Sequence, residues 1–141
     1  MTTSPPSSSP LPIEITFTGD LASVAPAVET VLALLAEVAV PGTADELLLT
    51  EALNNAVVHG QDPDGSGGCV ALSRDDAGYI EARITDGRRS LTAAQLASAT
   101  LPQATAESGR GLPLVVALNP DARVEDGCLV LRFAAIPPGH H

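Results

Sequence analysis

Strand-like and helix-like patterns follow one another along this 141-residue chain in an order that few folds can accommodate. Some segments alternate apolar and polar residues, as strands do, and others repeat with the helical period. The predicted order is one strand, two helices, two strands, a loop with a short helix, another helix and two strands. These segments lie at residues 13–19, 21–40, a helix after Thr43, 69–74, 79–86, a short helix within 90–107, a helix from about Leu112, and a hairpin at 122–133.

This order predicts an α+β fold, a two-layer α/β sandwich in which the helices cover one face of a mixed, mostly antiparallel sheet. A doubly wound fold is excluded because single strands do not alternate with single helices. The chain has the length of one domain. We expect a disordered Ser/Pro tail at residues 1–10, a single domain at 11–136 and a flexible C-terminus at 137–141.

The composition narrows the classes of function. With 17 acidic and 7 basic residues, the formal net charge is −10, which argues against a nucleic-acid groove because such grooves gather cations around phosphates. Residues 1–10 lack the basic and apolar parts of a secretory signal, and we expect the apolar runs to be too short to span a bilayer. These features predict a cytoplasmic protein. Cys69 and Cys128 lie in predicted strands, where reduced cysteines are usually small core residues.

One predicted helix carries polar residues that helix propensity does not explain. The run LLLTEALNNAVVHG, at 47–60, has two adjacent asparagines, each about 0.5–0.7 kcal/mol less favourable than Ala in a helix. Glu51, Asn54 and Asn55 lie opposite an apolar stripe when successive residues are placed about 100° apart. Glu51 and Asn55 are one turn apart, and their oxygens suit Mg²⁺, which leaves positions for phosphates and water. A merely solvated polar face is an equal alternative. The stripe consists of Leu49, Ala52, Leu53, Ala56 and Val57.

A carboxylate ends the third predicted strand at a position that should face the core. In YIEARITDG, Ile80, Ala82 and Ile84 share one face of the strand, and Asp86 has the same parity. A buried carboxylate needs a hydrogen-bond donor. An adenine amino group is one candidate donor, and a backbone amide or an arginine is the other.

Two glycines precede the predicted helix at Leu112. Gly109 and Gly111 let the backbone approach a ligand closely, and the first amides of a helix attract anions. Pro113 suits a first helical turn, where its missing N–H is not needed. The segment is therefore a candidate phosphate site, although the Walker loop and the dinucleotide fingerprint are both absent.

Three motifs in this order carry a resemblance to a known family. TEALNNAVVHG contains Glu51 and Asn55, ITDG contains Asp86, and ESGRGLPLV contains the glycine pair. They match the N box and the two glycine boxes of the GHKL (Bergerat-fold) ATPases. Within that superfamily the chain is most similar to the bacterial anti-sigma-factor serine/threonine-protein kinases. The resemblance covers residues 13–133 and implies that the 11–136 domain binds ATP.

The resemblance also implies a role for each matching residue. Glu51 would be the general base that polarises the attacking hydroxyl, Asn55 would bind Mg²⁺, and Asp86 would bind the adenine amino group. Residues 90–107 would form the lid over the nucleotide. The other cofactor-binding residues would be Gly87, Gly109, Arg110, Gly111 and Leu112.

The function that the resemblance implies is that of an anti-sigma factor. Such a protein binds a sigma factor and uses Mg-ATP to phosphorylate a serine of an anti-anti-sigma partner of the STAS type. A homodimer is left open, and neither nucleic acid nor a membrane is expected as a direct partner.

One position departs from the family pattern and keeps a second hypothesis open. The family's first glycine box has a glycine two residues after the aspartate, and this chain has Arg88 at that position. The alternative is a non-catalytic, partner-binding regulator with a degenerate nucleotide site. A third reading, an unrelated α/β domain with chance matches, is also retained.

Overall fold

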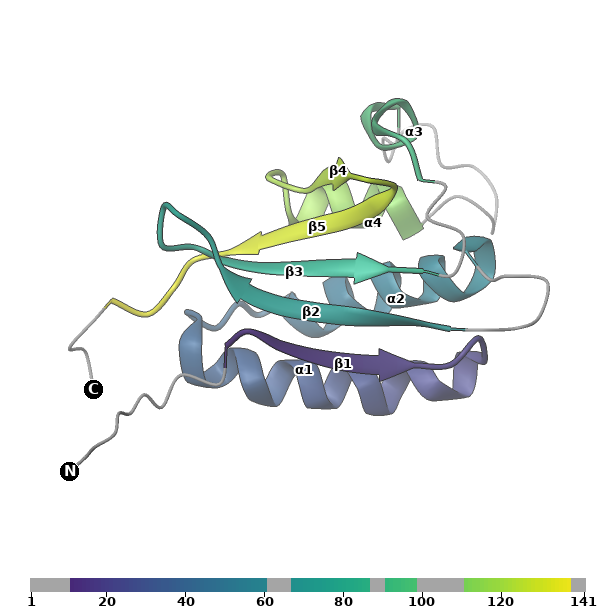
Figure 1. Ribbon diagram of the computed structural model, residues 1–141. Coiled ribbons are helices and arrows are strands. Elements are labelled where there is room, and N and C mark those ends of the chain that lie inside the picture. The colour runs from purple at the N-terminus through teal and green to yellow at the C-terminus, as the bar shows by residue number, and fades with distance from the viewer. Residues whose placement is uncertain (1–10, 61–66, 87–90, 99–110, 138–141) are drawn as a thin grey trace.

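A layer of helices covers one face of a five-stranded sheet (Figure 1). The computed structural model describes residues 11–60, 67–86, 91–98 and 111–137. The predictions for residues 1–10 and for most of 137–141 therefore lie outside the described residues. The elements are β1 (Ile13–Phe17), the 3-10 turn η1 (Leu21–Ser23), α1 (Val24–Val38), α2 (Asp45–Gly60), β2 (Gly68–Arg74), β3 (Ile80–Thr85), α3 (Ala93–Ala97), α4 (Gly111–Leu118), β4 (Arg123–Glu125) and β5 (Cys128–Phe133).

The observed order of helices and strands is the predicted one, and the α+β two-layer fold is confirmed. The strands are arranged as β1-β2-β3-β5-β4. Every pair of neighbouring strands that the structure describes is antiparallel, so the expectation of a mixed sheet was wrong. Each neighbouring pair is either a hairpin or is joined through helices that return the chain in the opposite direction. Parallel crossovers are therefore not needed.

The register of the central strands builds one apolar face. Ile80, Ala82 and Ile84 of β3 are buried and alternate with residues of the outer face. On β5 their partners are Phe133, Leu131 and Leu129, which are also buried. The predicted stripe of α2 is buried as well, because this helix packs its apolar side over the sheet. The stripe residues are Leu49, Ala52, Leu53, Ala56 and Val57.

The first long helix is more apolar than expected. The window Leu21–Val38 has a mean hydropathy of 1.7, long and apolar enough by composition to cross a membrane, so the expectation that no run reaches that length was wrong. Packing accounts for this hydropathy, since the same segment buries one side in the core. Its buried residues are Val24, Ala27, Val28, Val31, Leu35 and Val38. Pro26 lies in the first turn of α1, where a proline is tolerated.

Local turn chemistry fixes both hairpins. Between β2 and β3, the Asp75 carboxylate accepts hydrogen bonds from the backbone N–H groups of Ala77 and Tyr79, each at 2.9 Å. Between β4 and β5, Asp126 and Gly127 have φ values of 53° and 76°. Two successive positive φ values define a type I′ turn, whose twist matches that of the flanking strands.

Ion pairs cover the outer face of the sheet. Arg123 pairs with Glu81 and Glu125, and Arg83 also pairs with Glu125. These side chains cross between strands β3 and β4. Beneath them, on the same face of β5, Val130 is 0% exposed although it does not belong to the helix-side core. The alkyl stems of arginines can shield such apolar residues while their guanidinium groups stay at the surface.

Candidate nucleotide site

The polar face of α2 is present as predicted. Glu51, Asn54 and Asn55 are half-buried, whereas the residues on the opposite side of the helix are buried. Residues four apart on a helix lie one above the other, so Glu51 and Asn55 form one row. A carboxylate and a carboxamide thus lie next to each other on a helix whose other face is fixed in the core.

Asp86 follows directly on the last residue of β3. Thr85 belongs to the outer face of the sheet, where its Oγ1 lies 3.5 Å from the Cys128 Sγ. Asp86 is half-buried and has the same parity as the helix-facing residues Ile80 and Ala82. Figure 1 shows that β3 ends at the same end of the molecule as the C-terminal turns of α2.

Sequence reasoning missed a glycine that touches this strand end. A Cβ placed on Gly68 would lie 1.9 Å from the Thr85 carbonyl oxygen and 3.0 Å from the Asp86 Cα. The predicted strand begins at residue 69, whereas β2 begins one residue earlier, at Gly68. The available signal was the Gly67-Gly68 pair at the start of a strand, where glycine often marks close approach of another backbone segment.

The glycine-opened helix also forms where it was predicted. α4 begins at Gly111, and Pro113 lies in its first turn. Leu112 packs against the core, and Val115 is 0% exposed. α4 lies along α2, which itself contacts β3. α2 therefore contacts both of the other motif-bearing elements. Gly87, Arg88, Gly109 and Arg110 lie outside the described residues.

A buried asparagine fixes the other end of α4. The Asn119 side-chain amide donates a hydrogen bond to the Arg132 carbonyl oxygen at 2.8 Å, and its side-chain oxygen accepts one from the Arg132 N–H at 3.2 Å. Asn119 is 8% exposed and is the only buried polar residue among those that the structure describes. This clamp holds α4 against β5. An Asn directly after an apolar helix was the only signal of it in the sequence.

The predicted short helix within 90–107 is α3. The Thr92 hydroxyl oxygen accepts a hydrogen bond from the Gln95 N–H, and the Gln95 side chain accepts one from the Thr92 N–H. This reciprocal pair is a capping box. Leu96 is buried and holds the helix near β4 and α4. The rest of the predicted lid lies outside the described residues.

The candidate ligands suit magnesium that is bound together with a nucleotide. They suit a metal ion held by protein side chains alone less well. Within the described ranges, no three His, Cys, Asp or Glu side chains gather as metal ligands. Asn55 and Glu51 offer neighbouring oxygens, and Mg²⁺ commonly binds through one or two protein groups together with phosphates and water. The first amides of α4 supply the partial positive charge that phosphates require.

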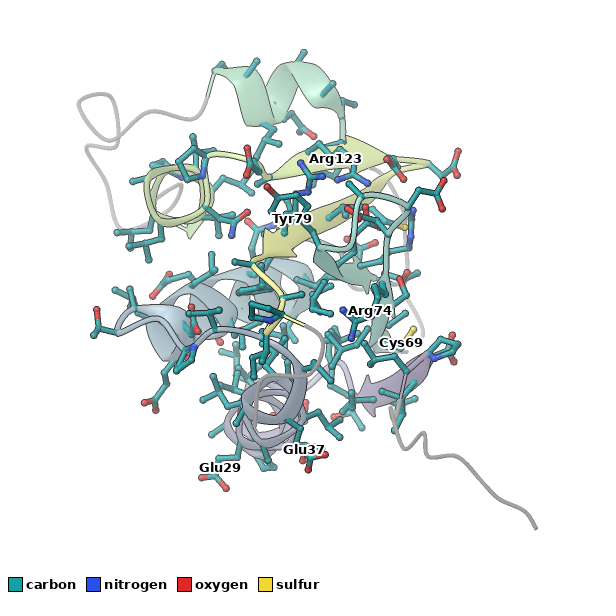
Figure 2. All side chains as sticks on the ribbon, turned by 90° about the vertical axis from the view of Figure 1, so that its left-hand side faces the viewer. Glu29, Glu37, Cys69, Arg74, Tyr79 and Arg123 are labelled. Atoms are coloured by element: carbon teal, nitrogen blue, oxygen red, sulfur yellow. The ribbon has the colours of Figure 1, made fainter. Side chains whose placement is uncertain are left out.

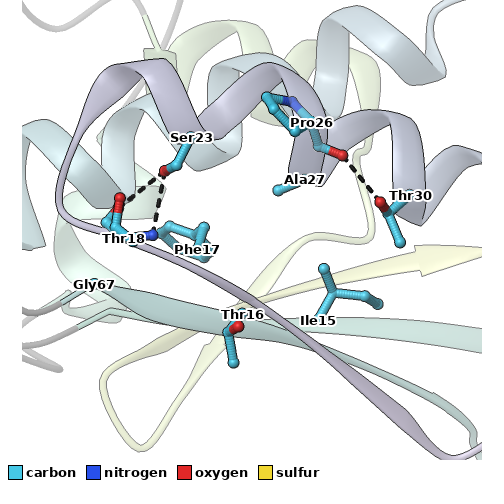
Figure 3. A pocket seen from close by; sticks show the side chains of 9 residues that line it. All are labelled: Ile15, Thr16, Phe17, Thr18, Ser23, Pro26, Ala27, Thr30 and Gly67. Atoms are coloured by element: carbon cyan, nitrogen blue, oxygen red, sulfur yellow. Dashed lines mark hydrogen bonds between the residues drawn. The ribbon is translucent and has the colours of Figure 1, made fainter.

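A shallow groove of about 530 Å³ lies elsewhere, between β1 and α1 (Figure 3). Two of its hydroxyl groups, those of Ser23 and Thr30, form hydrogen bonds within the chain. The Ser23 hydroxyl donates to the Thr18 carbonyl oxygen and accepts from the Thr18 N–H, and the Thr30 hydroxyl donates to the Pro26 carbonyl oxygen. None of Glu51, Asn55 and Asp86 lines this groove, so it is separate from the candidate nucleotide site.

Comparison with known proteins agrees with this arrangement. Among solved structures, the chain is similar to the crystal structure of the RsbU and RsbW domains of Rv1364c from Mycobacterium tuberculosis, with 22% identity and a TM-score of 0.55. The match covers 92% of this chain and 34% of that one, so this chain spans about a third of its length. This likeness shows a shared fold. No curated protein sequence matches significantly.

The family assignment comes from the sequence itself. Residues 17–135 match the family described as the histidine kinase-like ATPase domain. This stretch contains α2, the end of β3 and α4, the three elements on which the motifs were recognised. The resemblance to the GHKL ATPases is thereby confirmed, and the chain belongs to the histidine kinase-like ATPase domain family.

Proposed function

We propose that this chain is a cytoplasmic anti-sigma factor with ATP-dependent serine kinase activity. It binds a sigma factor, and it phosphorylates a serine of an anti-anti-sigma partner of the STAS type. The observation that carries the kinase activity is the pairing of Glu51 and Asn55 on one half-buried face of α2, beside the strand end that leads into Asp86. The sequence resemblance to anti-sigma-factor kinases and the fold shared with a chain that contains an RsbW domain support the regulatory role.

The chain's own residues bind and orient the nucleotide. The Asp86 carboxylate accepts a hydrogen bond from the adenine amino group. The close approach of Gly68 to the backbone of Asp86 fixes the position of this residue. The N-terminal amides of α4 bind phosphate oxygens, together with Gly109, Arg110 and Gly111. Asn55 holds the magnesium ion through its side-chain oxygen. Bound Mg²⁺ neutralises charge on the phosphates of ATP.

Glu51 acts as the general base. Its carboxylate accepts the hydroxyl proton of the acceptor serine as the serine oxygen bonds to the γ-phosphorus. The bond between the γ-phosphorus and the bridging oxygen breaks, and ADP leaves with the electron pair. Positioning and charge neutralisation provide most of the rate enhancement in such transfers, which suits a carboxylate on a rigid helix.

Two measurements test this function. The first is calorimetric binding of ATP and ADP, with and without Mg²⁺. Asn55→Ala should remove the Mg²⁺ dependence, whereas Asn54→Ala, the adjacent asparagine in another row of α2, should retain it. The second is transfer of labelled phosphate to a STAS-type protein, which Glu51→Gln should reduce by about 10²-fold or more while ATP binding persists. Glu37→Gln is the matched control on the exposed side of α1.

A second candidate function is favoured by Arg88. The family has a glycine there, and an arginine side chain beside Gly87 would occupy space next to the adenine. The chain would then regulate a partner without catalysis. Absence of ATP and ADP binding at millimolar concentrations, together with retained partner binding, would support this candidate and contradict the kinase.

A further inference from the structure

Charge is divided unevenly along the chain. The first basic residue, other than histidine, is Arg74, and the seven arginines all fall between it and Arg132. The two long helices carry carboxylates but no Lys or Arg. Their acidic residues are Glu29, Glu37, Asp45, Glu46 and Glu51. Apart from His59, every ionisable side chain of α1 and α2 is therefore acidic.

Three of the four arginines of the described strands take part in ion pairs. Arg83 and Arg123 pair with Glu125, and Arg132 pairs with Asp75. Figure 2 shows Glu29 and Glu37 projecting from α1 at the bottom of the view, whereas Arg123 lies with the strands at the top. The fourth, Arg74 at the end of β2, lies between Arg123 and Glu37 in the same view. No carboxylate of α1 or α2 takes part in the ion pairs of the described residues.

An apolar groove follows the seam between these two helices. It consists of two adjoining depressions of about 200 and 240 Å³ that share Glu46 as a lining residue. We call it the α1–α2 groove. Glu29 and Glu46 take part in none of the ion pairs of the described residues. Its apolar lining from η1 and α1 comprises Leu21, Val24, Ala25, Val28, Leu32, Leu35, Ala36 and Ala39.

We propose that the α1–α2 groove docks a cationic amphipathic helix of the protein partner. The inference rests on that part of the proposed function in which the chain binds a partner, and it names the surface. α1 has 15 residues and is about 22 Å long at 1.5 Å per residue, which accommodates about four turns of a partner helix. The apolar side of the partner helix would pack on the Val and Ala residues that line the groove. The Lys or Arg side chains of the partner would reach Glu29 and Glu46.

Charge complementarity selects this occupant over others. A second copy of the chain would bring its own acidic helices against the groove, and like charges facing each other disfavour association. Nucleic acid would be repelled for the same reason. The chain's own first 12 residues contain no charged side chain, so they cannot supply the cations.

The groove also adjoins the candidate nucleotide site. Thr50 and Asn54 line it, and each is followed along α2 by a proposed catalytic or metal-binding residue, Glu51 or Asn55. Successive residues of a helix point about 100° apart, so these side chains lie on adjacent faces of the same turns of α2. A helix in the groove would therefore rest against the same segment of α2 that carries the chemistry.

A peptide probe tests the groove on the full chain without nucleotide. The probe is a fluorescein-labelled peptide of about 18 residues with Leu and Ala on one helical face and Lys on the other, and the comparison is its scrambled sequence. Anisotropy should show binding of the amphipathic peptide alone, and amide NMR shifts should change along α1 and α2. Equal binding of both peptides, or shifts confined to other elements, would overturn the proposal.

Matched variants separate docking from general attraction to an acidic protein. Glu29→Gln with Glu46→Gln should weaken the peptide about tenfold, and Ala25→Trp, which fills an exposed lining position, should do the same with no change in charge. Glu14→Gln with Asp121→Asn removes two exposed charges elsewhere and should have less than a twofold effect. Equal losses of peptide affinity in the two double variants would contradict docking in the α1–α2 groove.

Calorimetry with Mg-ATP on the same preparations distinguishes the two proposals. Specific peptide binding without ATP binding would contradict the kinase and retain the groove. ATP binding without specific peptide binding would retain the kinase and overturn the groove.

Discussion

Gly68 lies directly against the residue pair that leads into the candidate adenine site. A Cβ on Gly68 would fall 3.0 Å from the Asp86 Cα and 1.9 Å from the Thr85 carbonyl oxygen. Both neighbours are backbone atoms, so they cannot move aside as the end of a flexible side chain could. The first residue of β2 thereby sets the position at which β3 ends.

Gly68→Ala should therefore weaken ATP binding through displacement of Asp86. We expect a loss of stability of about 1–3 kcal/mol, as for overpacking, and a drop in ATP affinity of at least tenfold in the folded fraction. Thermal unfolding and calorimetry measure the two effects. Cys69→Ala, the next position of β2, is the control. Unchanged ATP affinity in a folded Gly68→Ala protein would show that the contact does not position Asp86.

Asp86→Asn should reduce affinity for ATP and ADP by similar factors, because the lost hydrogen bond is to the base and not to the phosphates. A hydrogen bond to a charged group contributes about 1.5–3 kcal/mol, which corresponds to a factor of about 10 to 150. Competition between ATP and GTP measures base selection and should show a smaller preference for ATP. A loss that affects ATP but spares ADP would place Asp86 near the phosphates instead.

Asn119→Ala should destabilise the fold more than substitution of a half-buried asparagine does. The side chain makes two hydrogen bonds to the backbone of Arg132 and is buried. Its removal leaves those backbone groups without their partner, at a cost of about 1–3 kcal/mol. Urea unfolding measures the difference, with the half-buried Asn54→Ala as reference. Equal midpoints for the two variants would mean that α4 is held by apolar packing alone.

Acid should weaken the ion pairs on the outer face of the sheet. Hydrogen bonds from Arg123 and then Arg83 hold the pKa of Glu125 below its ordinary value of 4.5. Because the folded-state pKa is the lower one, this stabilisation is complete above the unfolded value and is lost as pH falls through the folded value. The urea midpoint between about pH 3 and pH 6 should fall less steeply for Glu125→Gln than for wild type, with Asp121→Asn as the unpaired control. Parallel curves would show that these pairs contribute no pH-dependent stability.

Local rules accounted for the elements and for part of the site. The one-turn spacing of Glu51 and Asn55 follows from helix geometry alone, and the Asp126-Gly127 turn follows from the backbone preferences of its two residues. The order of elements likewise follows from periodicity. Each of these features depends on residues close together in sequence.

Contacts between distant segments were decided only by the tertiary structure. The sequence does not encode locally that β5 lies between β3 and β4, or that the sheet is antiparallel throughout the described strands. Arg123 and Glu81 are 42 residues apart and meet only because of this strand order. The Gly68 contact with Asp86 and the Asn119 clamp on Arg132 have the same origin. Periodicity reports which side of an element is buried, whereas the neighbour that covers it is chosen by packing of the whole chain.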